Sequence, residues 1–346
     1  MTPERKLKFQ NILYFIGIGL IFGLLYNFLF YPHTFVEFAE AGSISILIGM
    51  ILGTLEEFVL NRIFQRLAFL WVTIIRAILY SLMISIVLCL VLSIETAAVE
   101  QISYGDAVIE YLNSPLFRRD FLYSFFFIIL ILIIIQVILL IGRANFFRLI
   151  FGMYHKPREI SRIFMFADIK GSTSIAEKLT NVQFSAMLKE YFYDVSDAII
   201  MFGGEIYQYV GDEVVVIWPT RKKSNNCIRS FFKMQEIIAR KKDQYISKYG
   251  LVPEFKAGVH VGKVIVTAVG KQKKEIVYHG DVLNTASRIQ GECNALQQKL
   301  LVSEDMLNYI DPGSEFIVEK MEEIELKGKE QKLSLYGVRL ASHPEI

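Results

Sequence analysis

Cysteine and histidine are scarce in this sequence, and neither is placed to form a covalent or haem-binding framework. The three cysteines, Cys89, Cys227 and Cys293, lie far apart, which indicates reduced thiols rather than disulfides. His33 is the only histidine before position 143, so the apolar N-terminal half lacks the histidine set of a haem site. The formal net charge is only +2, which argues against a nucleic-acid partner.

Apolar residues are abundant instead, and they are concentrated before position 150. The mean hydropathy of +0.40 is too high for a wholly soluble chain. Four segments reach the roughly 20-residue length that crosses a bilayer as a helix. The first is too long, and too poor in small residues for cleavage, to be a signal peptide. We therefore expect an all-α transmembrane domain at residues 1–142, in contact with membrane lipid, with four helices at about 11–30, 43–60, 67–94 and 121–141.

Lysine and arginine flank these segments unevenly, which predicts the orientation of the membrane domain. Basic residues precede the first segment, separate the second from the third, and follow the fourth: Arg5, Lys6, Lys8, Arg62, Arg66, Arg143 and Arg148. The first and third loops are acidic, with Arg118 and Arg119 as the exception. The pattern predicts an integral membrane protein with four spans and both termini in the cytoplasm, and a bacterial inner membrane is the expected location.

Charged residues also occur inside the predicted spans. Glu56 and Glu57 close the second segment, and Arg76 lies within the third. A Glu–Arg pair across neighbouring helices is one interpretation, because ionisable groups in membranes are costly and often functional. Interfacial carboxylates and a snorkelling arginine are the alternative. Two Gly-x-x-x-Gly spacings predict close approach of helices, with a dimer contact as one option: Gly19 with Gly23, and Gly49 with Gly53.

A linker at residues 143–160 joins the two halves. It continues the last span as an amphipathic stretch until Pro157 breaks it. Such a segment either transmits helix motion or serves as a tether, and we favour transmission.

The C-terminal half, residues 161–346, alternates short β-like runs with longer helical ones. The Gly211-Asp212 pair between two strand-like runs predicts a hairpin. These patterns predict one α+β domain, with helices on one side of a mainly antiparallel sheet. The expected strands are 163–167, 205–210, 214–218, 255–261, 263–268 and 333–338, and the expected helices are 172–179, 182–202, 226–249 and 281–293.

Two carboxylates stand at predicted strand ends in this half. Asp168 follows a short apolar run, and Asp212 lies in the predicted hairpin turn. Mg²⁺ in proteins is commonly held by one or two carboxylates together with substrate phosphates. The residues after Asp168 add a helix start with free backbone N–H groups, which suits a polyphosphate: Gly171, Ser172 and Thr173. The pattern favours two-metal phosphoryl transfer.

Further polar residues lie on a later predicted helix and turn. Asn284 and Arg288 are four residues apart and so share one helix face. An amide and a guanidinium presented together can orient a ribose and stabilise charge on a phosphoryl group. Lys327 offers a point charge for a terminal phosphate, although two solvated loop lysines are the plainer reading of its Lys-Gly-Lys turn.

In their order and spacing, these motifs resemble the class III nucleotidyl cyclases. The resemblance covers about residues 162–339 and rests on 166–173, 210–213, 258–262, 283–288 and 326–329. It implies a ferredoxin-like catalytic core that dimerises head to tail, with active sites in the dimer cleft. Asp168, Ile169 and Asp212 would bind two Mg²⁺ or Mn²⁺ ions. Asn284, Arg288 and Lys327 would reach the same nucleoside triphosphate from the other subunit of the homodimer.

The base-reading positions depart from the family pattern. Adenylate-forming members usually place Lys and Asp or Thr where this chain has Gln208 and Val277, and guanylate-forming members typically use Glu and Cys. Gln208 can meet either purine edge, and Val277 offers no hydrogen bond unless a one-residue slip presents Tyr278. ATP is favoured because adenylate-forming members are commoner, and guanylate cyclase is the alternative. A diguanylate cyclase and a catalytically silent nucleotide-binding receptor are weaker hypotheses.

Overall fold

The computed structural model divides into two compact units, Met1–Leu140 and Ile141–Ile346. Each unit has its own buried core, and each is treated by itself below. The residues that the structure describes are 3–31, 34–60, 69–220, 223–321, 323–325 and 332–341.

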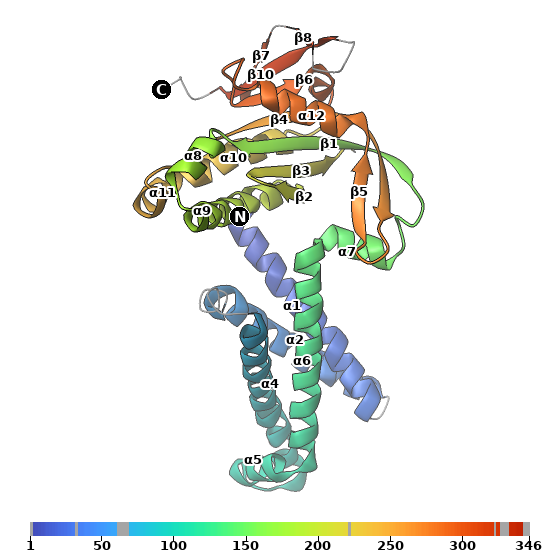
Figure 1. The fold of residues 1–346 in the computed structure, drawn as a ribbon. Coiled ribbons are helices and arrows are strands. Elements are labelled where there is room, and N and C mark those ends of the chain that lie inside the picture. Colours follow the sequence, from blue (N-terminus) through green and yellow to red (C-terminus); the bar gives the residue numbers. More distant parts are fainter. Residues whose placement is uncertain are drawn as a thin grey trace. The chain divides into compact units, whose positions relative to one another are not determined.

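The described part of the N-terminal unit contains four long apolar helices, as predicted (Figure 1). The second candidate span begins at Phe35 rather than at 43, because Thr34 caps the helix by accepting a hydrogen bond from the Glu37 backbone. A short helix that the hydropathy pattern does not reveal, α5 (Tyr104–Asn113), precedes the fourth span. The remaining elements are α1 (Pro3–Phe30), α2 (Phe35–Leu55), η1 (Glu56–Leu60), α4 (Phe69–Glu100) and α6 (Pro115–Ile141).

Glycines bring α1 and α2 close together within this unit. A Cβ atom on Gly49 would lie 2.6 Å from the Cα of Ile16, and one on Gly19 would lie 3.1 Å from the Ser45 carbonyl oxygen. The Gly-x-x-x-Gly spacings therefore serve contact between two helices of one chain, and the structure gives them a role without a dimer.

The Glu–Arg pair predicted inside the membrane domain is present. The Arg76 guanidinium lies 2.9 Å from the Glu56 carboxylate, and the Tyr80 hydroxyl donates to the same carboxylate. Asn11 of α1 donates to Glu57 at 3.1 Å. These contacts compensate the charges of Glu56, Glu57 and Arg76 among the apolar helices.

The C-terminal unit is built on an eight-stranded sheet (Figure 1). Strands β2, β3, β1 and β4 lie side by side in that order and are antiparallel, which with the intervening helices gives the βαββαβ order of a ferredoxin-like fold. Strand β6 extends the sheet parallel to β4, followed by β10 and β7, and β5 also pairs with β4. The bounds are β1 (Arg158–Ile169), β2 (Glu205–Val210), β3 (Glu213–Pro219), β4 (Phe255–Val269), β5 (Glu275–His279), β6 (Leu300–Ser303), β7 (Phe316–Lys320) and β10 (Leu335–Leu340), with β8 (Ile324–Glu325) and β9 (Lys332–Leu333) forming a separate pair.

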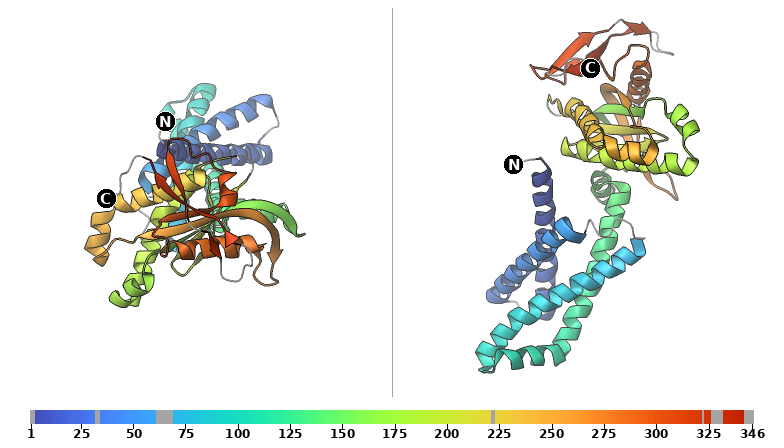
Figure 2. Two further views of the ribbon diagram at one scale, coloured as in Figure 1. Left: turned by 90° about the horizontal axis from the view of Figure 1, so that it is seen from above. Right: turned by 90° about the vertical axis from the view of Figure 1, so that its left-hand side faces the viewer.

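Helices cover both faces of this sheet, so the prediction of helices on one side is wrong (Figures 1 and 2). Met165 and its alternate neighbours on β1 pack in the core beneath α9 and α10, whereas Phe164 and Phe166 pack on the other face with α12 and β5. Burial on both faces explains why β1 is a continuous apolar run. The helices are α8 (Ser172–Lys178), α9 (Asn181–Met201), α10 (Asn226–Arg240), α11 (Lys242–Tyr249), α12 (Asp281–Glu292) and α13 (Glu304–Leu307).

Two glycines of β4 set the distance to α12. A Cβ on Gly258 would lie 2.2 Å from the backbone nitrogen of Gln290, and one on Gly262 would lie 2.5 Å from the Val282 side chain. The expected break between strands 255–261 and 263–268 is therefore wrong, because Gly262 serves this contact within one continuous strand. The helix expected at 226–249 is in turn divided at Lys241.

The linker helix α7 (Arg143–Ile150) belongs to the C-terminal unit. It begins after Gly142, whose φ of 87° ends α6 in a conformation that favours glycine. The Arg148 guanidinium donates two hydrogen bonds to the Glu205 carboxylate of β2, at 2.8 and 3.0 Å, and lies over the Tyr154 ring. The linker is thus clamped to the sheet, and signal transmission through it stays a prediction.

Replacing Gly258 tests the contact between β4 and α12. We expect Gly258→Ala to lower the unfolding midpoint by about 2–12 °C, since overpacking of ~1–3 kcal/mol in a unit of this size has that effect. Unfolding of the full chain would be followed by tryptophan fluorescence in a Trp71→Phe background, which leaves Trp218 in the core beneath α9 as the single tryptophan. Gly291→Ala is the matched control on α12, because no atom lies within 4 Å of its Cβ position. Equal midpoints for the two variants would contradict the close contact.

Candidate active site

The sheet brings the two predicted carboxylates together. Asp168 is the penultimate residue of β1 and lies opposite Glu213 of β3. Asp212 precedes Glu213 in the β2–β3 turn, which Gly211 permits with a φ of 63°. The carboxyl groups of Asp168 and Asp212 lie within hydrogen-bonding reach of each other. Neighbouring strand ends therefore place two acidic groups at one point.

The electrostatics of this pair favour a bound cation. Burial, then the hydrogen bond and charge of Asp212, raises the pKa of Asp168 to about 6, against opposing effects of Lys256 and Gln290. Burial and the charges of both aspartates raise the pKa of Glu213 to about 7. Asp168 and Glu213 thus hold protons more tightly than usual, because the positive charge of Lys256 only partly offsets burial and the neighbouring carboxylates.

The donor set also fits a divalent metal ion. Among the described residues, Asp212 Oδ2 is buried without a hydrogen-bond partner, although carboxylate oxygen is the ligand that Mg²⁺ and Mn²⁺ prefer. The Ile169 side chain is buried in the main core, so this predicted metal position can offer only its backbone carbonyl. Asp168 and Asp212 are the residues suited to hold the metal.

Two residues beside the carboxylates were missed by sequence reasoning. Gln290 Nε2 donates a hydrogen bond to Asp168 Oδ2 at 3.0 Å, and close packing of α12 on Gly258 makes this contact possible. Tyr191 of α9 is fully buried near both aspartates, and its hydroxyl has no partner among the described residues. For Gln290, the available signal in the sequence was its position two residues after Arg288, on the inner face of the same predicted helix.

The predicted phosphate cradle follows β1 directly. Gly171 has a φ of 68° and begins α8, and no side chain caps the helix. The first backbone N–H groups of the helix, at Ser172 and Thr173, are therefore free to meet an anion. The cradle lies three residues beyond Asp168 along the chain.

Asn284 and Arg288 are on the other side of α12. Residues of its inner face, such as Ala286, Ile289 and Gln290, are buried against the sheet, whereas Asn284 is exposed and Arg288 is half-buried. Among the described residues, no hydrogen bond or ion pair joins Asn284 or Arg288 to the carboxylates. One chain therefore contains both the carboxylates and the Asn284–Arg288 pair, but within that chain the two do not meet.

The base-reading residues lie on β2 and β5. Gln208 is exposed beside a bulge in β2, and Val277 lies opposite Thr267 of β4. Their neighbours Tyr207 and Tyr278 meet instead, with ring centroids 5.0 Å apart. Tyr278 is buried in this contact, and its hydroxyl has no hydrogen-bond partner among the described residues, so the one-residue slip considered for it stays a prediction. Lys327 lies outside the described residues.

Comparison with known proteins identifies relatives of both units. A family profile described as the adenylate and guanylate cyclase catalytic domain matches residues 155–339. Adenylate cyclase 2 of Rhizobium meliloti (strain 1021) is 32% identical over 253 residues, which cover 72% of this chain and 68% of that protein. This share exceeds the unit Ile141–Ile346, so the similarity extends into the helical unit.

Two more distant comparisons concern the C-terminal half. An adenylate cyclase of Anabaena cylindrica is 25% identical over 181 residues, or 51% of this chain and 36% of that protein. The solved structure of a bacterial light-regulated adenylyl cyclase superposes with a TM-score of 0.50 at 20% identity, covering 60% of this chain and 64% of that one. The superposition shows a shared fold.

The raised pKa of Asp168 predicts how the metal-free protein responds to pH. Because the pKa of Asp168 is about 6 in the folded state and 3.8 in an unperturbed aspartate, folding takes up a proton between these pH values. Stability is therefore gained as the pH falls through 6 and lost as it rises through 6. We expect Asp168→Asn to remove this loss, so that from pH 5 to pH 8 the stability of the variant rises relative to that of the wild type by about 1 kcal/mol.

Thermal unfolding of the full chain in EDTA at both pH values measures this difference. Glu254→Gln, at an exposed carboxylate near the same strand end, is the control and should follow the wild type. An Asp168→Asn variant whose pH dependence is the same as that of the wild type would show that the carboxylate is not in the described environment.

Proposed function

The chain belongs to the class III adenylate and guanylate cyclase family, and we propose that it converts ATP to 3′,5′-cyclic AMP and pyrophosphate. The observation that carries this proposal is the meeting of the carboxyl groups of Asp168 and Asp212, where the pKa of Asp168 is raised and Asp212 Oδ2 is buried without a partner among the described residues. In the reaction the ribose 3′-oxygen bonds to the α-phosphorus, the bond from that phosphorus to the pyrophosphate oxygen breaks, and the 3′-hydroxyl proton is released.

The residues of one chain have distinct roles in this reaction. Asp168 and Asp212 would hold two Mg²⁺ or Mn²⁺ ions, with the Ile169 carbonyl as a further ligand. When bound, such ions lower the pKa of a hydroxyl nucleophile and neutralise phosphate charge. Gln290 holds the Asp168 carboxylate in place through its 3.0 Å hydrogen bond. The free N–H groups at Ser172 and Thr173 would bind phosphate oxygens.

We infer that a second copy of the chain completes each site. Asn284 and Arg288 face away from the carboxylates of their own subunit, and the described residues give Arg288 no ion pair. In a head-to-tail homodimer they would reach the partner's nucleotide, where Asn284 fixes the ribose and Arg288 stabilises charge in the transition state. Lys327 would hold the terminal phosphates.

ATP is the proposed substrate because the relatives reported above are named adenylate cyclases. GTP is the second candidate, because the exposed Gln208 amide has both a donor and an acceptor for a purine edge. The four apolar helices support an integral membrane protein, and the basic residues that flank them support a cytoplasmic catalytic unit. A bacterial inner membrane fits the two bacterial relatives.

A nucleotide panel tests the activity and the orientation together. With Mn²⁺ or Mg²⁺, inside-out membrane vesicles should cyclise added ATP faster than GTP, and sealed right-side-out vesicles should not. Asp168→Ala and Asp212→Ala should abolish turnover, and Arg288→Ala should lower kcat by about 10²–10³. Tight nucleotide binding without any cyclic product would indicate the silent receptor, and a cyclic dinucleotide from GTP would indicate a diguanylate cyclase.

Mixing variants tests the composite site. Asp168→Ala chains should be inactive and Arg288→Ala chains nearly so, but a mixed dimer contains one site with intact carboxylates and an intact arginine. Equal co-expression should restore about a quarter of the wild-type activity, because half the dimers are mixed and each has one complete site of two. Asp168→Ala with Asp212→Ala is the matched control and should stay inactive. No recovery in the first mixture would argue for sites within single chains.

A further inference from the structure

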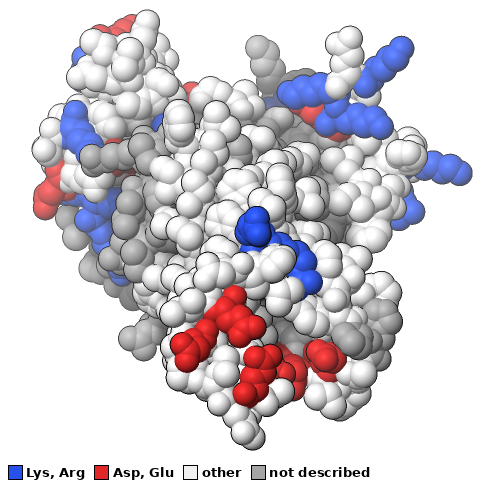
Figure 3. Space-filling view, turned by 90° about the horizontal axis from the view of Figure 1, so that it is seen from below, with Lys and Arg blue, Asp and Glu red and all other residues white. Residues whose placement is uncertain are grey.

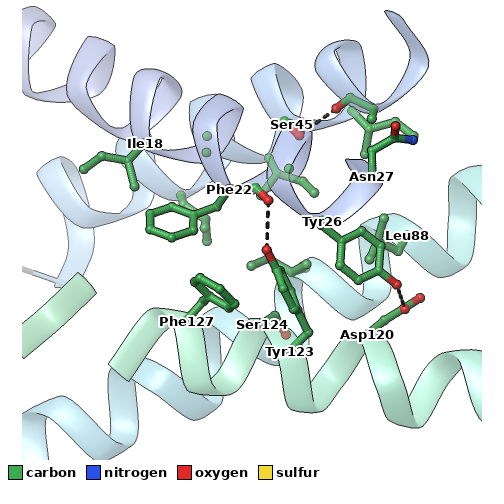
Figure 4. A pocket seen from close by; sticks show the side chains of 18 of the residues that line it. Ile18, Phe22, Tyr26, Asn27, Ser45, Leu88, Asp120, Tyr123, Ser124 and Phe127 are labelled. Atoms are coloured by element: carbon green, nitrogen blue, oxygen red, sulfur yellow. Dashed lines mark hydrogen bonds between the residues drawn. The ribbon is translucent and has the colours of Figure 1, made fainter. Parts of the chain in front are cut away.

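The helical unit contains a cavity of about 320 Å³ between α1, α2, α4 and α6 (Figure 4). Its middle is lined by apolar side chains that include Phe22, Leu88 and Phe127. The glycine contacts hold α1 and α2 together on one side of it. A cavity of this volume is within the range of small-molecule sites, and its apolar lining disfavours water.

One end of the cavity is acidic. Glu37, Glu40 and Glu95 contribute to its lining, and no lysine or arginine among the described residues does so. None of these three glutamates forms an ion pair within the described part of the chain. Acidic side chains gather on the face of the helical unit shown in Figure 3, beside a smaller basic group.

The nearest charges at this end are already paired with each other. Asp120 accepts hydrogen bonds from Tyr26, from Tyr111 at 2.9 Å and from Arg119 at 3.3 Å. Arg119 also donates to the Tyr31 hydroxyl at 3.0 Å. Asp120 and Arg119 therefore satisfy each other, and the excess negative charge of the three glutamates remains.

An unsatisfied acceptor lies at the same end. Asn27 lines the cavity and is only 4% exposed. Its Nδ2 donates to the Glu37 carbonyl at 3.3 Å, which fixes the amide, and its Oδ1 accepts no hydrogen bond from the described residues. A buried carbonyl oxygen without a donor is costly, so this position suits a ligand that carries an N–H or O–H group.

The cavity is also elongated. Its lining on α1 runs from Phe15 to Tyr31, a length of about 24 Å at 1.5 Å per residue. An aliphatic chain fits such a shape, but lipid tails are equally apolar, so the chain alone cannot select a ligand from a bilayer. Selection must come from the acidic end, where the ring of Tyr123 can also face a cation, since the Tyr26 ring already lies against the Arg119 guanidinium.

We propose that this cavity binds a cationic amphiphile, with a protonated amine at Asn27 and the glutamates and a single aliphatic chain among the four helices. The amine supplies the N–H donor that Asn27 Oδ1 lacks and the positive charge that Glu37, Glu40 and Glu95 lack. The site lies wholly within the helical unit and is independent of the cyclase chemistry.

Binding of dodecylamine, which is protonated at pH 7, tests the proposal. The full chain in phosphatidylcholine nanodiscs would be titrated calorimetrically, with empty nanodiscs subtracted. Dodecylamine should bind more tightly than dodecyltrimethylammonium, which lacks the N–H donor, and than dodecanol, which lacks the charge. Dodecanoate should not bind. Equal binding of the amine and dodecanoate would overturn the proposal.

Variants distinguish binding in the cavity from binding at the lipid-facing surface. Leu88→Trp fills the cavity and should abolish saturable binding, whereas the matched Leu90→Trp, at a side chain 50% exposed on the same helix, should leave it unchanged. Asn27→Leu should weaken amine binding about tenfold, the effect of one lost hydrogen bond, without changing dodecyltrimethylammonium binding. Retained binding in Leu88→Trp would overturn the proposal even if Asn27→Leu fails to fold.

Discussion

The electrostatic conflict between Asp168 and Asp212 is the constraint on which the catalytic unit depends. Two like charges in a half-buried position are unfavourable, as the raised pKa of Asp168 shows, and the fold holds them there through the β1–β3 register and the Gly211 turn. A protein retains such a pair when a cation resolves the conflict. Membership of the cyclase family, which generally uses divalent metal ions, agrees with that physical argument.

Helix α12 links the two aspartates to the other groups that the proposed reaction needs. Its inner face lies so close to β4 that only glycine fits at position 258, and this proximity lets Gln290 reach Asp168. Its outer face presents Asn284 and Arg288 away from the same carboxylates. Helix α12 therefore positions Asp168 in its own subunit through Gln290 and presents Asn284 and Arg288 to the site of a second subunit. The proposed mechanism consequently requires two chains.

The helical unit shows a similar division between tight and loose packing. Backbone contact through glycines joins α1 to α2, whereas the space shared with α4 and α6 is left partly open. Charges elsewhere in this unit are compensated, as in the Glu56–Arg76 contact, whereas the three glutamates of the cavity form no ion pair among the described residues and Asn27 Oδ1 has no donor there. A buried amide oxygen without a donor costs stability, and a ligand is the simplest physical reason for keeping it.

The sequence by itself determined the four apolar helices, the β2–β3 hairpin and the identity of the carboxylates, because hydropathy, turn residues and motif order are local properties. It did not reveal β5, β6 and β7, the second helical layer, or the contact from Gln290 to Asp168. Those features arise between segments far apart in the chain, where the missing Cβ of a glycine decides how closely a helix and a strand can approach. Only the tertiary structure could show that Asn284 and Arg288 point away from the aspartates, since helical spacing gives a shared face but not what that face meets.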